Sequence, residues 1–155
     1  MFARAIAAFL MLPGVFMFAV PVVLAAATGP AQIVQPFGLI PVVVGTAGAL
    51  WCARDFYVRG KGTPAPWMPP TALVIAGLYR YTRNPMYGSG VLIVTGWAIA
   101  FGSLVVAGYA ALIAVAFHLR LVQYEEPVLA RTFGPAWEDY KRRVPRWLGR
   151  HTPIS

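Results

Sequence analysis

Two adjacent carboxylates, Glu125 and Glu126, follow a long apolar segment of the chain. Carboxylates at the end of an apolar helix are costly unless they are solvated or paired with cations. Pro127 comes next and has no N–H, so the carbonyl of Gln123 is expected to lose its usual helical partner. Such a carbonyl beside two carboxylates suits a bound cation. Alternatively, the acids simply begin a short helix over residues 127–133, where negative charge favours the helix dipole. Local physics leaves both readings open.

A second polar group, residues 77–90, has the sequence GLYRYTRNPMYGSG. Asn84 is a good helix N-cap and Pro85 suits the first helical turn, so the pair predicts a helix start. The two amides that follow Pro85 are then free at the positive end of the helix, which is an arrangement that binds anions. Gly88 and Gly90 lack side chains and allow a ligand or a neighbouring helix to approach closely.

The elements that carry these groups are expected to be membrane helices. Hydrophobic residues make up 59 % of the chain and charged residues 12 %, so the apolar surplus must face lipid. The expected spans are residues 5–27, 34–53, 87–101 and 104–122. The third is short for a core of about 30 Å, and with the fourth it forms a tight hairpin. The sequence therefore predicts an all-α polytopic membrane protein, a single domain over residues 1–155, with short cytosolic C-terminal helices.

Charge placement predicts the orientation. The net charge is +8, and the basic residues lie before the first span, between the second and third, and after the fourth. By the positive-inside rule these regions and both termini are cytoplasmic, in a bacterial inner membrane or an ER-like membrane. The first apolar segment is longer than that of a signal peptide and is expected to be retained. Cations that flank spans do not indicate nucleic-acid binding. A single cysteine, Cys52, excludes an internal disulfide and a multi-cysteine metal site, so no metal is expected.

Two further segments are polar. Residues 60–70 are too rich in proline and glycine for a helix, and are interpreted as an interfacial linker anchored by Trp67 rather than as a lid over a site. Residues 133–147 are interpreted as a short amphipathic helix, with Gly134 ending the preceding helix and Pro135 opening this one. Two ion pairs four residues apart are expected on it, Glu138–Arg142 and Asp139–Arg143.

Two stretches resemble the signature of the isoprenylcysteine carboxyl methyltransferase and phospholipid methyltransferase superfamily of integral membrane enzymes. Residues 77–87, GLYRYTRNPMY, are similar to its G-x-Y-R-x-x-R-H-P-x-Y motif. The second stretch resembles the family's E-E … F-G-x-x-Y-x-x-Y-x-x-x-V-P ending and consists of Glu125-Glu126, Phe133-Gly134, Tyr140 and Val144-Pro145. Asn84 replaces the usual histidine, so a histidine contact is in doubt. Trp137 replaces a frequent tyrosine and keeps an aromatic wall.

The resemblance implies S-adenosylmethionine as the cofactor, bound through the motifs at 77–90 and 120–147. Its carboxylate is expected at the start of the third span with Arg83, and its cationic groups near Glu125 or Glu126. Adjacent helical residues point about 100° apart, so one glutamate is expected to contact the cofactor and the other a protein cation, with Glu126 preferred as the ligand. The expected cofactor-binding residues are Arg83, Asn84, Pro85, Tyr87, Gly88, Gly90, Tyr124, Glu126 and Tyr140.

Two residues are expected to act on the methyl acceptor. Glu125 is suited to accept a proton from an amine. The resemblance implies that Arg143, which matches a family arginine near the acceptor, holds a carboxylate or phosphate. The implied reaction is methyl transfer to a lipophilic acceptor, such as a prenylcysteine carboxylate or a phospholipid amine, that enters laterally from the bilayer at the cytosolic face. The other partners are membrane lipids, and the sequence predicts no oligomeric state. The alternatives are an NADPH-dependent reductase of the steroid-reductase type and a non-catalytic membrane protein that binds lipid or a partner.

Overall fold

The computed structural model describes residues 14–29, 32–60 and 72–148. Within these ranges the regular structure is helical, without strands, which confirms the predicted all-α class. The helical elements are η1 (Val15–Ala19), α2 (Val20–Thr28), η2 (Pro36–Gly38), α3 (Leu39–Arg59), η3 (Gly77–Arg80), α4 (Pro85–Phe101), α5 (Leu104–Arg120), η4 (Leu121–Glu125), α6 (Glu126–Phe133) and α7 (Pro135–Arg143). The start of the first predicted span and the linker with Trp67 lie outside the described residues.

The chain divides into two compact units. Unit 1 comprises Met1–Ala47 and Ser89–Val115, and unit 2 comprises Gly48–Gly88 and Ala116–Ser155. The single domain over residues 1–155 stays a prediction.

Two helical stretches of the described chain are long and apolar enough to cross a membrane, Pro36–Arg59 and Leu104–Phe133. The stretches Val15–Thr28 and Pro85–Phe101 are shorter apolar helices. Both long helices continue beyond the predicted spans, which ended at Ala53 and Val122, because the backbone stays helical through the polar residues that follow, to Arg59 and Phe133. Many of their large apolar side chains are exposed, as expected for surfaces in contact with lipid.

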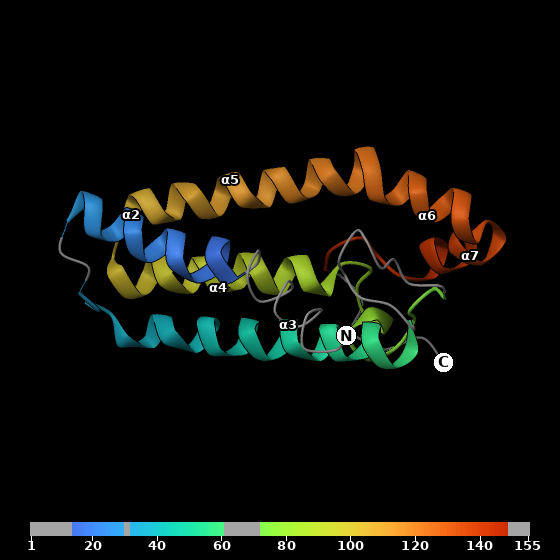
Figure 1. Cartoon of the computed structure of the whole chain (residues 1–155), viewed down its shortest axis with the longest axis horizontal. Helices are drawn as coiled ribbons and strands as arrows, with labels where there is room; N and C mark the ends of the chain where they lie inside the picture. Colours follow the sequence, from blue (N-terminus) through green and yellow to red (C-terminus); the bar gives the residue numbers. More distant parts are fainter. Residues whose placement is uncertain (1–13, 30–31, 61–71, 149–155) are drawn as a thin grey trace. The chain divides into compact units, whose positions relative to one another are not determined.

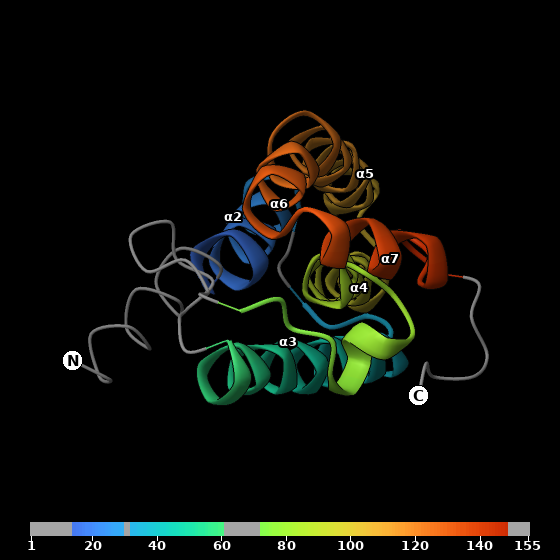
Figure 2. The same ribbon diagram turned by 90° about the vertical axis from the view of Figure 1, so that its right-hand side faces the viewer.

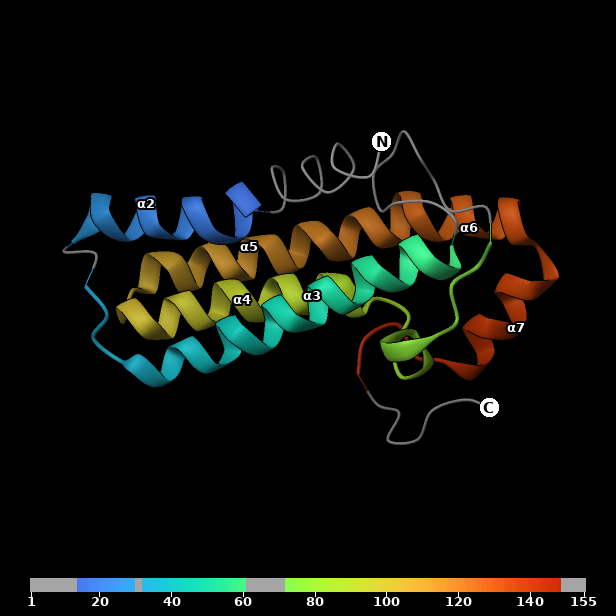
Figure 3. The same ribbon diagram turned by 60° about the horizontal axis from the view of Figure 1, so that its bottom comes forward.

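In unit 1, α2, α4 and α5 lie side by side (Figures 1 and 3). The ring of Phe18 meets that of Trp97 edge to face, at 6.2 Å between centroids. The carbonyl of Ala100, near the end of α4, accepts hydrogen bonds from the amides of Val34 and Gln35 at 2.8 and 3.1 Å. These bonds connect the residues that precede α3 to the C-terminal end of α4.

The predicted hairpin between α4 and α5 is confirmed. Gly102 has φ +60°, and the amide of Ser103 donates to the carbonyl of Ala98 at 3.0 Å. The amide of Gly102 donates to Ile99, and the two bonds together form the Schellman motif that ends many helices. The Ser103 hydroxyl then accepts from the amide of Val106 at 3.3 Å and caps α5.

Pro127 does not interrupt its helix. The residues before it form the π-helical segment η4, in which the amide of Glu126 donates to the carbonyl of Leu121, five residues back. Pro127 has no N–H to donate. In the π register the carbonyl that loses its partner for this reason is that of Val122, five residues back, whereas an α-helix would leave the carbonyl of Gln123 without one. Stretching to a π turn lets the chain pass the proline and stay helical to Phe133.

In unit 2, the extended residues before η3 lie between two clusters of buried side chains. Val74 belongs to a cluster with Cys52 and Tyr79, whereas its neighbours Leu73 and Ile75 pack on a second cluster, which consists of Trp137, Tyr140 and Val144. Successive side chains of an extended chain point to opposite sides, so one short segment contacts both clusters. Figure 2 shows α7 beside the segment that leads into α4. The segment thereby positions the predicted motif at 77–90.

The C-terminal part of unit 2 agrees with the sequence except at its end. Gly134 separates α6 from α7, as predicted, and the chain changes direction there (Figure 3). The prediction that the helix continues to Trp147 is wrong, because α7 ends at Arg143 and Val144 is extended, with φ −121° and ψ 128°. The residue before a proline disfavours helical geometry, and Pro145 follows Val144.

Gly77, the first residue of η3, has φ +54°, and an added Cβ would overlap Oδ2 of the buried Asp55 on α3. We predict that Gly77→Ala destabilises the protein by about 1–3 kcal/mol, because alanine disfavours this backbone conformation. The measurement is the midpoint of thermal unfolding in detergent, which should fall by about 2–4 °C for each kcal/mol. Gly108→Ala in α5, where a Cβ meets nothing within 4 Å, is the matched control. Equal midpoints for the two variants would contradict the prediction.

Candidate functional site

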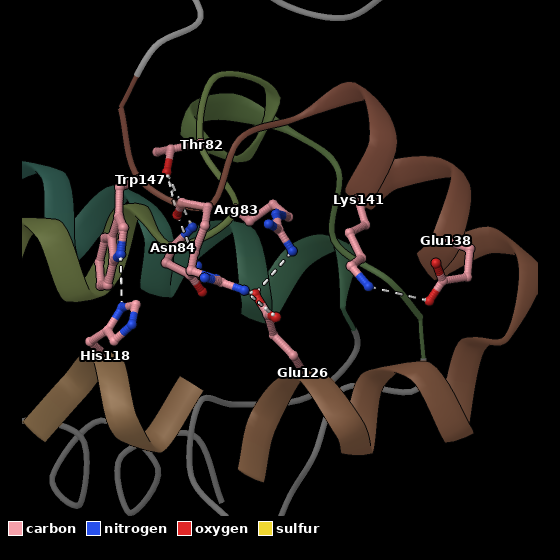
Figure 4. A network of polar contacts seen from close by, with 9 residues as sticks. Thr82, Arg83, Asn84, His118, Glu126, Glu138, Lys141 and Trp147 are labelled. Carbon is pink, nitrogen blue, oxygen red and sulfur yellow. Dashed lines mark hydrogen bonds and ion pairs between the residues drawn. The ribbon is translucent and has the colours of Figure 1, made fainter. Parts of the chain in front are cut away.

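A cluster of two arginines and one glutamate lies in unit 2. Nη1 of Arg83 donates to Oε1 of Glu126 at 2.9 Å. Arg146 donates through Nε to the same oxygen at 2.8 Å and through Nη2 to Oε2 at 3.0 Å. Figure 4 shows Arg83 and Glu126 at the centre of this network. The Arg83 and Glu126 side chains are 8 % and 12 % exposed, so these charges interact with little screening by water.

The cluster holds two positive charges against one negative charge, an excess of one positive charge. Burial lowers the pKa of Arg83, which the negative charge of Glu126 partly offsets, and the hydrogen bond to Glu126 raises the pKa of Arg146. The guanidinium of Arg83 lies over the ring of the buried Trp137, 5.6 Å from its centroid, and a role of Trp137 as an aromatic wall of the site stays a prediction. Nε of Arg83 is buried and has no partner among the residues that the structure describes.

The residues after α7, Val144–Trp147, form a strap that ties the cluster together. The carbonyl of Pro145 accepts from the amide of Arg83 at 2.9 Å. The carbonyl of Arg146 accepts from the Thr82 hydroxyl at 3.1 Å and from the Asn84 side-chain amide at 3.0 Å. The next strap residue, Trp147, donates its indole N–H to Nδ1 of His118 on α5 at 3.2 Å (Figure 4). Three segments distant in sequence are thereby held together.

The predicted start of the third span is confirmed, since α4 begins at Pro85. The backbone carbonyl of Asn84 accepts from the amide of Gly88 at 3.1 Å, as the residue before a helix does. The Asn84 side chain donates to the strap, so the asparagine takes part in fixing the segment in place.

A second network surrounds Glu125. The Tyr87 hydroxyl donates to Oε1 of Glu125, and Nε of Arg120 donates to that oxygen at 3.0 Å and to the Tyr87 hydroxyl at 3.2 Å. Arg120 and Glu125 are five residues apart. Side chains at this spacing lie on different faces of an α-helix, but they lie on the same face when a π turn separates them. Arg120 also lies over the Tyr124 ring at 5.6 Å. Glu125, 28 % exposed, is the more accessible of the two glutamates.

The structure distributes the predicted site residues unevenly. Arg83, Asn84 and Glu126 share the arginine cluster and its strap, whereas Tyr87, Tyr124 and Glu125 gather around Arg120. The roles assigned to these residues stay predictions.

The remaining predicted residues lie apart from both networks or support them. The ring of Tyr140 is buried, and its hydroxyl donates to the carbonyl of Tyr79 at 2.7 Å. Gly88 is exposed in the first turn of α4, and Gly90 is buried further along that helix in unit 1. Arg143, half exposed, pairs with Asp139 as predicted, whereas Glu138 pairs with Lys141. A contact of Arg143 with an acceptor stays a prediction.

Sequence reasoning missed Arg120 and Arg146 as members of the site. Two adjacent carboxylates at an apolar helix end require cationic partners, which was the available signal. It does not say which of the many basic residues nearby supply them.

The chain is similar to one known protein family and to two curated proteins. Residues 34–136 match a family model described as phospholipid methyltransferase. Two similar curated proteins are the nickel-cobalt-cadmium resistance protein NccN of Alcaligenes xylosoxydans xylosoxydans and the cobalt-zinc-cadmium resistance protein CzcN of Cupriavidus metallidurans. Each is 30 % identical over 113 residues, which are 73 % of this chain and 48 % of the relative. The chain thus spans about half the length of the curated relatives it matches. No solved structure matches it.

The hydroxyl of Tyr140 joins α7 to η3. We predict that Tyr140→Phe lowers the free energy of unfolding by about 1–3 kcal/mol, because it removes a buried donor from the Tyr79 carbonyl. Thermal unfolding in detergent measures the change. Tyr124→Phe, at a side chain that is 61 % exposed, is the control and should leave the midpoint unchanged. A midpoint for Tyr140→Phe equal to that of the control would show that this bond does not hold the site.

Proposed function

Since this chain belongs to the phospholipid methyltransferase family, we propose that it transfers a methyl group from S-adenosylmethionine to a lipophilic acceptor. Its family and its apolar helices make it an integral membrane protein. The chain spans about half the length of its curated relatives. The methyl-transfer activity is therefore stated for this chain as a proposal.

The observation that carries the proposal is an arginine cluster with excess positive charge next to a carboxylate that keeps one oxygen for a ligand; these are the two poles of the proposed site. Arg83 and Arg146 outweigh the charge of Glu126 at the start of α4. The adjacent Glu125 pairs with Arg120 through Oε1 and is partly open to solvent. The amino-acid end of S-adenosylmethionine carries a carboxylate and an ammonium group, followed by a sulfonium. A ligand with this charge pattern has a complementary partner at each pole.

We assign the ligand carboxylate to Arg83 and the first turn of α4, because Arg83 keeps a buried N–H without a partner among the described residues. The ligand cations are assigned to Glu125. Both oxygens of Glu126 already accept hydrogen bonds from arginines, whereas those described for Glu125 all reach Oε1. The pairing of one glutamate with the cofactor and one with protein cations is therefore proposed with Glu125, not Glu126, as the ligand.

The aromatic residues divide in the same way. Tyr124 is exposed and Tyr87 partly so, and their rings offer faces for adenine or a cation. The ring of Tyr140 is buried in the core and supports the site from behind.

S-adenosylmethionine supplies a methyl group on a sulfonium, and the lone pair of the acceptor forms the new bond to carbon as the carbon–sulfur bond breaks. The residues of the chain supply alignment and exclusion of water, which lower the barrier by several kcal/mol in such reactions. If the acceptor is an amine, Glu125 is the proposed site for the proton released. Arg143 is the proposed contact for an acidic acceptor. We place the site at the cytoplasmic face, with both termini on that side, on the basis of the basic segments.

The names of the two relatives concern resistance to metal ions. No group of three or more histidine, cysteine, aspartate or glutamate side chains gathers within the ranges that the structure describes. The proposal concerns methyl transfer alone.

Calorimetry on detergent-purified protein tests the proposal. We expect saturable binding of S-adenosylmethionine and no binding of NADPH, which a reductase would require. Glu125→Gln should weaken the binding on the order of tenfold, equivalent to about 1.4 kcal/mol, by removing the charge that faces the ligand cations. Glu138→Gln, at an exposed side chain on α7, is the control. Folded protein that binds NADPH but not S-adenosylmethionine would refute the proposal.

A further inference from the structure

The guanidinium of Arg146 forms a bidentate ion pair with Glu126. Its Nε and Nη2 donate to the two different oxygens of that carboxylate, at 2.8 and 3.0 Å. This paired geometry is the strongest one that an arginine and a carboxylate form. Arg83 contributes a single bond to the same carboxylate, through Nη1. The charge of Glu126 is therefore met chiefly by Arg146.

The strap fixes Arg146 in this position. Its backbone is held by bonds from Thr82 and Asn84 to its carbonyl, and by the bond from the Arg83 amide to Pro145. Because the chain leaves helical geometry at Val144, Arg146 is not part of the basic surface of α7, where Arg142 is 76 % exposed. A residue with these backbone and side-chain bonds is built into unit 2.

The consequence concerns Arg83. With Arg146 present, the cluster carries one excess positive charge beside the start of α4. Without Arg146, Glu126 and Arg83 would form an isolated pair with no net charge. Charges with little exposure to water interact strongly, so a ligand carboxylate beside Arg83 would then be repelled by a Glu126 whose charge Arg83 alone offsets at hydrogen-bond distance.

We propose that Arg146 is a positioning residue that neutralises Glu126 and thereby keeps Arg83 available to the carboxylate of the cofactor. The inference rests on the proposed function, because it assigns that carboxylate to Arg83. It makes the charge of Arg146, rather than a contact with the ligand, the property that matters.

Four proteins test the inference by calorimetry in detergent: the unaltered chain, Arg146→Gln, Arg146→Lys, and the double variant Arg146→Gln/Glu126→Gln. Their cluster charges are +1, 0, +1 and +1, counted from Arg83, Glu126 and residue 146. We expect Arg146→Gln to weaken binding of S-adenosylmethionine on the order of tenfold. Arg146→Lys and the double variant should bind within a few-fold of the unaltered chain. Recovery of the affinity when Glu126→Gln is added to Arg146→Gln is expected only if Arg146 acts by neutralising the charge of Glu126.

Decarboxylated S-adenosylmethionine, which lacks the carboxylate, is the matched ligand. Its affinity should be the same for the unaltered chain and Arg146→Gln. Arg142→Gln, which removes an exposed arginine from α7, should not change the affinity for either ligand. Thermal unfolding of every variant shows whether it is folded. If Arg146→Gln does not fold, the affinities of the lysine and double variants still decide the test.

The outcomes separate the two proposals. If the unaltered chain binds S-adenosylmethionine and Arg146→Gln binds it equally well, the inference is wrong and the proposed function stands. Equal losses for both ligands, or a double variant no better than Arg146→Gln, would mean that Arg146 acts only on structure, which also overturns the inference. Failure of the unaltered, folded chain to bind S-adenosylmethionine refutes the proposed function and the inference with it.

Discussion

The mostly buried carboxylate of Glu126 is the constraint that organises unit 2. A carboxylate that is 12 % exposed must be matched by cations and hydrogen-bond donors, and a helix of mainly apolar residues supplies neither. The matching cations come from two distant segments, the residues before α4 and the strap after α7. Meeting the needs of one side chain therefore brings together the parts of the chain that carry most of the polar residues.

The hydrogen bonds of the backbone follow from this arrangement. Once Arg146 is paired with Glu126, the strap lies beside residues 82–84, and its carbonyls accept from Thr82, Arg83 and Asn84. Beneath them, Tyr140 joins α7 to η3, and alternating side chains of residues 73–75 reach the clusters on either side. The site is thus supported by packing on one side and by paired charges on the other. Preorganised surroundings of this kind hold a ligand in one orientation.

Local signals in the sequence predicted the elements of the fold well. Pro85 opens α4, Gly102 and Ser103 form the turn to α5, and Gly134 separates α6 from α7, because each depends on the backbone preferences of one or two residues. Arg120 and Arg146, two of the three arginines that pair with the glutamates, were not predicted. Arg146 becomes a partner only because Pro145 takes the chain out of the helix, and its carboxylate is 20 residues away. The tertiary structure decides which cation pairs with a given carboxylate. The local sequence around Glu125 and Glu126 therefore does not predict the partner.

The π segment before Pro127 has a consequence for the relatedness of sequences in this region. One widened turn accommodates one residue more than an α-helix of the same rise, so it acts as a single-residue insertion that is absorbed without a loop. The side chains on its two flanks are consequently out of phase by about 100° compared with an uninterrupted helix. A homologue that lacks the proline can lose one residue here and keep both faces of the helix unchanged. Gaps of one position between Arg120 and Glu126 are therefore compatible with the same three-dimensional site, and an alignment that forbids them would superimpose residues from different faces.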